Sequence, residues 1–378
     1  VDAPNSARVI QWYAETIDKT YDEIAPAPRN ALAMITREPL GVIGAVVPWN
    51  YPMMITSWKL GPALAMGNSI VVKPAENSSL SALKMAELAV AAGLPAGVFN
   101  VVPGLGAEAG QALARHMDVA KIAFTGSGPT GRKMMQYAAE SNMKQVSLEL
   151  GGKSPQVVLN DCIDLEAAAS TIAWAIYYNA GQTCNAGSRI IVEKGVKEEL
   201  FAHLHKFLES FVVGNQFDPT TQMAGLVSEL QRDRVNAYLD LVGQDGEKIV
   251  YGGEKTSGKD LLIKPTLIDN VKPGSRLAQE EIFGPVLVAI DAKDEAEALQ
   301  LANGTEYGLA ASVWTNNVAR AHKFARKLRA GTVWVNTFDM LDVITPFGGF
   351  GASGNGRDKS LHALDAYSAL KTTWVDLN

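Results

Sequence analysis

The sequence predicts an α/β protein built from two open sheets, each covered by helices, with one small β hairpin beside them. Short runs rich in β-branched residues alternate with helical stretches that end near a glycine, from Leu40 to Gly152 and again from Pro155 onward. This alternation is typical of parallel strands with helices on both faces. In such sheets, ligands are expected at the carboxyl ends of the strands.

The composition is that of a globular protein with a large buried core. Of the 378 residues, 47% are hydrophobic and 20% are charged, which disfavours general disorder and suits two or more domains. A net charge of -6 leaves no broad cationic surface, so no nucleic-acid partner is expected. The longest apolar stretch contains Asp164 and Glu166, which disfavours a membrane span. Cys162 and Cys184 are too few for a disulfide framework and, with no secretory signal visible, they favour the cytoplasm.

The first element is a helix whose apolar residues Val9, Ile10, Tyr13 and Ile17 are predicted to share one face. Because Val1 is not an initiator Met and the helix begins almost at once, the chain is expected to start partway through a domain.

The polar stretch from Tyr21 to Pro39 predicts a pair of short strands, the second reading ALAMITREP. An exposed hairpin is either a decorated sheet edge or a surface that pairs with another subunit. A solitary hairpin is marginal in water, so a partner is expected.

The first α/β segment contains four predicted strands and three predicted helices. The strands read GVIGAVVPW, SIVVKPA, VFNVVPG and KIAFTG, and the helices read WKLGPALAMG, SSLSALKMAELAVAAG and GRKMMQYAAE. Polar groups follow three of these strands.

Asn50 follows the first strand in the sequence PWNYP, where two prolines stiffen the backbone and present the amide as a fixed donor; an ordinary Asn turn is the alternative. Lys73 and Glu76 follow the second strand, a spacing that suits ribose hydroxyls or a surface ion pair. The range 126–131 reads GSGPTG between a strand and a helix, matching the dinucleotide pattern G-x-G-x-x-G. Glycines that serve only a turn are the alternative, because no acidic residue is cleanly placed about 20 positions on.

The second α/β segment begins beyond Gly152. Its predicted strands are PQVVL, SRIIVE, YLDLV, LIKPTLID, EEIFGPVLVAI, ASVWT and TVWVN, and its predicted helices are 164–179, 196–212, 295–303 and 318–329. The last helix is basic and is expected to be a solvated face. No repeat or long linker separates the two segments, so a cleft between them is the expected active site.

One thiol and one carboxylate stand out between Gln145 and Arg189. Glu149 precedes a Gly-Gly turn and Cys184 lies in a Gly-bounded loop, a combination that suits thiol-based acyl chemistry. The alternatives are a buried hydrophobic thiol and a solvated surface charge. A cofactor-free thiol hydrolase would need a histidine partner, and none of the five histidines lies in a recognisable motif.

Several motifs, in order and spacing, resemble those of the aldehyde dehydrogenase superfamily from Gly41 to Lys371. They are PWNYP, WKLGPALAMGNSIVVKPAE, FTGS, LELGGKSP, GQTC, EEIFGPV, NGTEYGLA, VWVN and PFGG followed by SGNGRD. The stretch SGNGRDKSLHAL is similar to enzymes of polyamine breakdown that oxidise 4-aminobutyraldehyde or its γ-glutamyl derivative. Two departures are Gly351, where many relatives have Lys, and an expected absence of the family's N-terminal portion.

The resemblance implies a fold, a cofactor and a catalytic set. Cys184 would be the nucleophile, Glu149 the general base, and the Asn50 amide with the Cys184 backbone N–H the oxyanion hole. The implied cofactor is NAD, bound in a Rossmann-like domain by Val47, Pro48, Trp49, Lys73, Glu76, Gly106, Thr125, Gly126, Ser127, Leu150, Glu281 and Phe283. Because Glu76 would repel a 2′-phosphate, NAD is expected over NADP. No metal site is expected.

The resemblance also divides the chain into regions. They are an NAD-binding domain (1–16 and 40–151, with 352–365 returning to it), a catalytic domain (152–351) and oligomerisation strands (17–39 and 366–378). A homodimer or homotetramer is therefore expected. A dehydrogenase that passes its thioester to coenzyme A and a catalytically silent protein on the same scaffold remain as alternatives; Glu149 disfavours the former.

The substrate pocket implied by the resemblance comprises Tyr51, Trp58, Asp339, Leu341, Asp342 and Phe347. Asp339 and Asp342 would attract an ammonium tail between aromatic walls, or form a solvated acidic loop.

Overall fold

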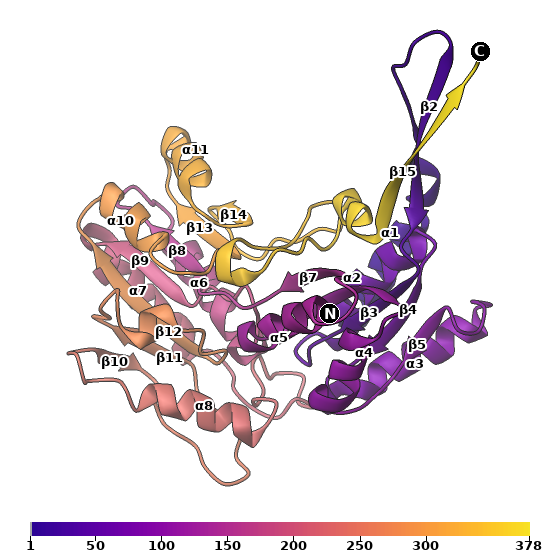
Figure 1. The fold of residues 1–378 in the computed structure, drawn as a ribbon. Helices are drawn as coiled ribbons and strands as arrows, with labels where there is room; N and C mark the ends of the chain where they lie inside the picture. The colour runs from indigo at the N-terminus through magenta and orange to yellow at the C-terminus, as the bar shows by residue number, and fades with distance from the viewer. Residues whose placement is uncertain (1) are drawn as a thin grey trace. The chain divides into compact units, whose positions relative to one another are not determined.

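The computed structural model describes residues 2–378, which separate into two compact units. Unit 1 contains the chain up to Leu150 together with Leu341–Gly348 and Gly354–Asn378, and unit 2 contains Gly151–Met340 and Gly349–Ser353 (Figure 1). Both units carry an open, mostly parallel sheet with helices. The predicted α/β class is confirmed.

The sheet of unit 1 has five strands in the order β5-β4-β3-β6-β7, and every neighbouring pair is parallel. The strands are β3 (Val42–Val46), β4 (Ser69–Lys73), β5 (Phe99–Val101), β6 (Val119–Thr125) and β7 (Gln145–Glu149). Ile43, Ile70 and Ile122 are fully buried, as expected of strands covered on both faces. The strand order reverses between β3 and β6, the position at which open α/β sheets form a ligand crevice.

The helices of unit 1 follow the alternation predicted from sequence. They are α1 (Asp2–Ala14), α2 (Pro52–Ala65), α3 (Ser79–Ala91), α4 (Gln111–Arg115) and α5 (Gly128–Ala139), with short turns η1 (Ile17–Lys19), η2 (Glu76–Ser78), η3 (Gly106–Gly110) and η6 (Leu361–Tyr367).

Helix α1 packs on α2 through a glycine. A methyl group at Gly61 would lie 2.3 Å from Cδ2 of Tyr13, which is 1% exposed. The predicted apolar face of α1 is only partly correct, because Val9 and Tyr13 are buried whereas Ile10 and Ile17 are exposed. The helix ends at Ala14, so Ile17 falls in a separate 3₁₀ turn and leaves the helical register.

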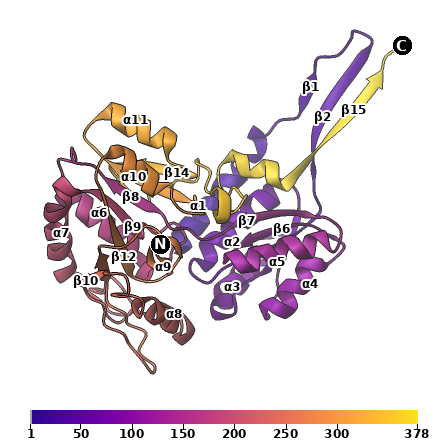
Figure 2. The same cartoon turned by 60° about the vertical axis from the view of Figure 1, so that its left-hand side comes forward.

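A three-stranded antiparallel sheet extends from unit 1 as an arm (Figures 1 and 2). Strands β1 (Glu23–Ala25) and β2 (Ala31–Pro39) form the predicted hairpin, and β15 (Ser368–Asp376) pairs with β2 along its whole length. The hairpin therefore finds a partner strand within its own chain, and β15 is an edge strand.

The sheet of unit 2 has seven strands in the order β10-β11-β12-β9-β8-β13-β14, all parallel except β10. The strands are β8 (Pro155–Val158), β9 (Arg189–Glu193), β10 (Lys248–Tyr251), β11 (Thr266–Asp269), β12 (Val286–Ala292), β13 (Ala310–Trp314) and β14 (Thr332–Val335). The central strand β9 is buried at every residue.

The helices of unit 2 are α6 (Leu165–Tyr177), α7 (Lys194–Glu209), α8 (Glu229–Leu239), α9 (Arg276–Gln279), α10 (Glu295–Ala302) and α11 (Val318–Lys327), with turns η4 (Tyr178–Gly181) and η5 (Gly351–Ser353). The prediction of a strand at YLDLV is wrong. Its first residues end α8, where Arg232, Val235, Tyr238 and Leu239 are buried at helical spacing.

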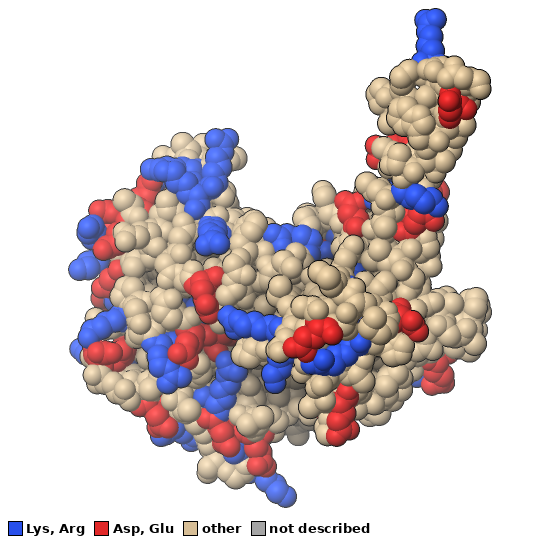
Figure 3. Space-filling view, viewed as in Figure 1, with Lys and Arg blue, Asp and Glu red and all other residues tan. Residues whose placement is uncertain are grey.

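The basic helix α11 is solvated on its charged face, as predicted. Lys323 and Arg320 bind Glu295 at 2.5 and 2.8 Å, and basic side chains gather over this helix in Figure 3.

Gly61→Ala is expected to destabilise the protein. Alanine favours a helix by about 1 kcal/mol over glycine, but the new methyl group would displace the Tyr13 ring, and overpacking costs about 1–3 kcal/mol. Chemical denaturation measures the free energy of unfolding. Gly128→Ala is the control, because its methyl group would lie 3.6 Å from Arg132 and stability should hold or rise; equal stability changes in both variants would contradict the packing role of Gly61.

Candidate active site

Polar and glycine residues meet at the carboxyl edge of the unit 1 sheet. Val47 is buried just after β3 and donates its N–H to the Lys73 carbonyl at 3.1 Å. Pro48, Trp49 and Asn50 follow at half-buried positions, and Tyr51 and Pro52 then begin α2. Parallel pairing places the ends of β3, β4, β6 and β7 at the same edge, so the sequence motifs that follow these strands are brought to one side of the sheet.

Lys73, Glu76 and Gly106 form one hydrogen-bonded group after β4 and β5. Glu76 Oε1 accepts hydrogen bonds from Lys73 Nζ and from the Gly106 N–H, both at 2.8 Å. Partial burial opposes ionisation of Glu76, yet the hydrogen bond from Lys73 and the Gly106 N–H leave its pKa lowered. The ionised form of Glu76 is therefore favoured, and a carboxylate can accept hydrogen bonds from hydroxyl groups.

Gly126 and Ser127 lie between β6 and α5. A methyl group at Gly126 would lie 2.6 Å from the Phe124 ring, and one at Gly131 would lie 2.8 Å from Leu150, so the backbone approaches its neighbours more closely than a side chain permits. Ser127 occupies the N-cap position of α5 without a capping hydrogen bond from its side chain, and the first N–H groups of this helix favour anions. Thr125 ends β6 with a buried hydroxyl group.

Glu149 is the last residue of β7 and is 3% exposed. Neither carboxyl oxygen has a hydrogen-bond partner among the described residues. Burial, and then the charge of Asp358, raise the pKa of Glu149 well above its ordinary value; Lys59 and Arg357 act in the opposite sense. Burial therefore disfavours ionisation of this carboxyl group.

A buried ion pair lies in the same unit and was missed from sequence. Lys59 Nζ contacts Asp358 Oδ2 at 2.5 Å, and the two side chains are 1% and 5% exposed. Lys121 is also buried, which lowers its pKa to about 8. The available signal was Lys59 itself, a charge inside the apolar helix sequence WKLGPALA.

Cys184 lies in unit 2, in the connection from α6 to β9. Asn179, Ala180 and Gly181 adopt left-handed conformations that end η4, and a methyl group at Gly181 would lie 2.1 Å from the Gly284 carbonyl oxygen. The Thr183 carbonyl then accepts from the Ala186 N–H at 3.1 Å, so Cys184 occupies a tight turn. Its side chain is half-buried, and its carbonyl oxygen would lie 2.6 Å from a methyl group at Gly152.

Glu281 packs against the same Gly-Gly turn in unit 2. Its Oε1 accepts from the Gly152 N–H at 3.0 Å, and its Oε2 would lie 2.2 Å from a methyl group at Gly151. Burial raises the pKa of Glu281 to about 7, and burial followed by the charge of Arg189 lowers the pKa of Lys153 to about 7. Phe283 is held in a left-handed conformation two residues later.

The predicted substrate residues divide between the units. In unit 1 the Trp58 and Phe347 rings lie 5.2 Å apart, and Lys359 Nζ lies 5.2 Å from the Trp58 centroid. Lys359 Nζ also donates to the Asp342 carbonyl at 3.0 Å, beside the half-buried Leu341.

The two predicted acidic anchors differ in their surroundings. Asp342 forms an ion pair with Arg8 at 2.6 Å on an exposed surface of unit 1. Asp339 belongs to unit 2, where it accepts from the Asn185 amide at 2.6 Å. Asp342 is therefore one member of a two-charge group, and Arg8 was not foreseen from sequence.

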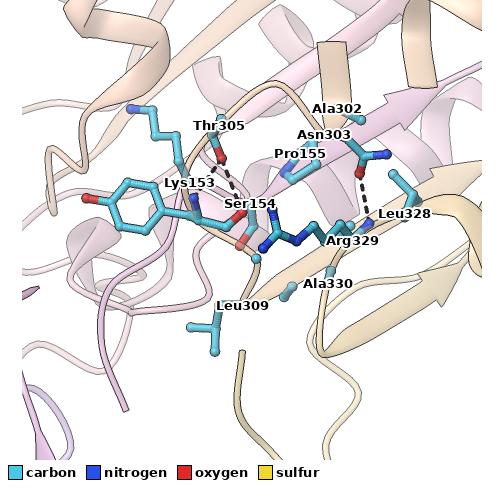
Figure 4. A pocket seen from close by; sticks show the side chains of 14 residues that line it. Lys153, Ser154, Pro155, Ala302, Asn303, Thr305, Leu309, Leu328, Arg329 and Ala330 are labelled. Carbon is cyan, nitrogen blue, oxygen red and sulfur yellow. Dashed lines mark hydrogen bonds between the residues drawn. The ribbon is translucent and has the colours of Figure 1, made fainter. Parts of the chain in front are cut away.

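A separate shallow pocket lies in unit 2, and none of the predicted site residues lines it (Figure 4). Its lining includes Ser154, Tyr307 and Arg329, and Asn303 accepts from the Arg329 N–H at 2.8 Å.

Within residues 2–378, no cluster of His, Cys, Asp and Glu suits a metal ion. Nor does this part of the chain contain a helix long and apolar enough to cross a membrane.

Glu281 and Lys153 are expected to shape the pH dependence of stability in opposite senses. The native state holds a proton on Glu281 more tightly than the unfolded chain, so stability falls as pH rises from about 4.5 to about 7, by about 3 kcal/mol. It holds a proton on Lys153 less tightly, so stability rises again from about 7 to about 10.5.

Denaturation at a series of pH values measures both slopes. Glu281→Gln should make the fall below pH 7 smaller, leaving the part contributed by the buried Glu149, and Lys153→Met should remove the rise above pH 7. A profile that neither variant alters would contradict the burial of these charges.

Comparison with known proteins identifies the family. Residues 1–373 match the model of the aldehyde dehydrogenase family. The chain is 50% identical to the NADP/NAD-dependent aldehyde dehydrogenase PuuC of Escherichia coli K12, over 100% of this chain and 76% of that protein. The structure is similar to γ-glutamyl-γ-aminobutyraldehyde dehydrogenase from Burkholderia cenocepacia J2315, with a TM-score of 0.96, 51% identity and coverage of 100% of this chain and 77% of that one.

An indole-3-acetaldehyde dehydrogenase crystallised with NAD⁺ is similarly close, with a TM-score of 0.97, 51% identity and the same coverage. The resemblance inferred from the motifs is confirmed: the chain belongs to the aldehyde dehydrogenase family, enzymes that oxidise aldehydes with a nicotinamide dinucleotide.

Proposed function

We propose that the chain oxidises an aldehyde to a carboxylic acid through a thioester on Cys184 that water hydrolyses. The observation that carries this proposal is Glu149, a buried carboxyl group without a hydrogen-bond partner in the part of the chain that the structure describes. Such a group is costly to keep unless it has a role, and a general base for water is the role its chemistry suits. The same residue favours hydrolysis over transfer to coenzyme A.

In the proposed cycle the Cys184 thiolate adds to the aldehyde carbonyl carbon. The Asn50 amide and the Cys184 backbone N–H donate to the resulting oxyanion; loss of one such donor typically slows a reaction by about 10²- to 10³-fold. When bound, NAD supplies the hydride acceptor that converts this adduct to a thioester. Glu149 then takes a proton from water, the hydroxide adds to the thioester carbonyl, and the Cys184 thiolate leaves as the acid forms.

The cofactor residues of unit 1 fit a dinucleotide. Glu76 is an anion with an accepting oxygen for ribose hydroxyls, and the backbone at Gly126 and Ser127 leaves N–H groups at the start of α5 for a pyrophosphate. In unit 2, Glu281 and Phe283 are proposed to hold the nicotinamide ribose and ring. The relative that binds NAD⁺ supports NAD, and the charge of Glu76 favours it over NADP.

The proposed substrate is an amino- or γ-glutamylamino-butyraldehyde of polyamine breakdown. The support is the name of the Burkholderia relative together with the exposed Arg8 and Asp342 pair. An acidic and a basic side chain side by side suit the ammonium and carboxylate of a γ-glutamyl head group. Asp342 alone would serve a simple ammonium tail.

We further propose that unit 1 binds NAD, unit 2 carries the nucleophile, and the arm assembles a homodimer or homotetramer. Strand β15 is an edge, and its Leu370 and Trp374 are 63% and 60% exposed, so a second chain would cover them. A nucleophilic thiol also favours a reducing compartment such as the cytoplasm.

The central test mixes the protein with NAD and a panel of aldehydes, with and without coenzyme A. NADH and the free acid should form without coenzyme A, and activity with NADP should be lower. Cys184→Ala should abolish NADH formation. Glu149→Gln should retain a first burst of NADH and lose at least about 10²-fold of the steady rate. Formation of an acyl-coenzyme A product would instead favour the acylating alternative.

The substrate assignment is tested with matched variants. Arg8→Ala should raise KM for γ-glutamyl-γ-aminobutyraldehyde by about tenfold, the value of one charge-assisted contact, and leave KM for butyraldehyde unchanged. Asp342→Asn should raise KM for both amino-bearing substrates. If the ratio of kcat/KM for these aldehydes to that for butyraldehyde stays constant in both variants, the proposed anchor is wrong.

A further inference from the structure

The carboxyl group of Glu149 lies in a slot walled by backbone. A methyl group at Gly356 would lie 2.6 Å from Glu149 Oε1 and 3.3 Å from its Cδ, and one at Gly348 would lie 2.7 Å from the same oxygen. Real side-chain carbons essentially never approach an atom this closely, so a Cβ atom at either position would displace the Glu149 carboxyl group. The slot therefore exists because two positions lack a Cβ atom.

The walls are fixed to each other and to β7. Phe347 and Asp358 exchange two N–H···O bonds of 2.7 Å, which places Gly348 and Gly356 side by side. The Gly356 N–H donates to the Leu148 carbonyl at 2.9 Å, and the Leu148 N–H donates to Asn355 Oδ1 at 2.9 Å. In Figure 1 the C-terminal segment accordingly runs beside the end of β7.

The slot does not replace the hydrogen bonds that the carboxyl group would form with water. Both oxygens lack hydrogen-bond partners within residues 2–378. Three charged groups act on Glu149: Asp358 raises the pKa of its carboxyl group, whereas Lys59 in α2 and Arg357 lower it. The buried Tyr367 in η6 also interacts electrostatically with Glu149. Burial outweighs all of them, so the acid in the slot is neutral near its ordinary pKa and ionises only at higher pH.

We propose that Gly356 and Gly348 are positioning residues that hold the Glu149 carboxyl group out of water and so set the pH at which thioester hydrolysis begins. This inference rests on the proposed role of Glu149 as general base. A catalytic carboxyl group whose ionisation is disfavoured by burial would add a proton-dependent step before water can be activated, without either glycine touching the substrate.

Gly356→Ala is the sharpest variant. The backbone of Gly356 does not lie in the left-handed region, so alanine fits it, and the nearest obstacle is the flexible end of Glu149. The Leu148 carbonyl, at 3.0 Å, need yield only slightly. Gly348 is unsuitable, because its φ of +154° and the Gly356 carbonyl oxygen, 2.3 Å from the new methyl group, would distort the backbone.

The first readout is the rate of thioester hydrolysis after the NADH burst, measured against pH. In Gly356→Ala the carboxyl group moves toward water, so the acid limb should move down by about one pH unit or more, and hydrolysis on that limb should quicken by about tenfold or more. Gly274→Ala is the control, because its methyl group would meet no heavy atom within 4 Å. An unmoved limb in a folded Gly356→Ala protein overturns the proposal.

The second readout does not depend on activity. In the parent protein, Glu149→Gln should gain thermal stability progressively as pH rises above 4.5, since the native state binds the proton more tightly than the unfolded chain. In the Gly356→Ala background that pH-dependent gain should vanish. If the parent shows no such gain, or the gain persists with alanine at this position, the slot does not hold the carboxyl group as described.

The two readouts separate this inference from the proposed function. If Glu149→Gln hydrolyses the thioester at the parent rate, Glu149 is not the base and the proposed function fails, whereas the stability comparison still tests the slot. If Gly356→Ala fails to fold, the stability of Glu149→Gln relative to the parent protein still tests whether Glu149 is held out of water. Absence of the pH-dependent gain in stability would then overturn the proposal.

Discussion

The candidate site depends on close approaches to bare glycine backbone. Gly152 lies against the Cys184 backbone carbonyl, Gly181 against the Gly284 backbone carbonyl, and Gly151 against the Glu281 carboxyl group. In each case a single methyl group would occupy the space of an atom already present. Such approaches position the loops that carry Cys184 and Glu281.

Burial of charge is the second constraint. Lys59 and Asp358 compensate each other inside unit 1, whereas Glu149 has no such partner and is shifted toward its neutral form. Burial of an ion pair costs less free energy than burial of a lone charge, because the two groups attract and hydrogen-bond each other. A buried carboxyl group without such a partner responds with a raised pKa. The same fold thus pairs one buried carboxylate with a lysine and leaves another buried carboxyl group without a hydrogen-bond partner among the described residues.

The fold class and the order of most elements were predictable because alternating β-rich and helical runs have distinct periods. The helix predicted over 164–179, for example, is α6, and Asp164 accepts a hydrogen bond at its start from the Ala167 N–H. YLDLV was mistaken for a strand because a short apolar run does not reveal its period. Its first two residues, Tyr238 and Leu239, end helix α8, and the helical spacing shows only when Arg232 and Val235, which precede them, are included. Asn50, Lys73, Glu76 and Gly126 were located from strand ends alone, whereas Arg8 and Gly356 depend on contacts between distant segments, which no local pattern records.

The arm has a consequence for how the chain reaches its native state. Thr36 and Lys371 meet across β2 and β15 although 335 residues separate them in sequence. Loop closure on this scale is slow, and during synthesis β2 emerges long before its neighbour exists. Until β15 is made, the unsatisfied edge of β2 is a site for pairing with other nascent chains, so chaperones and rapid completion of translation would limit such pairing.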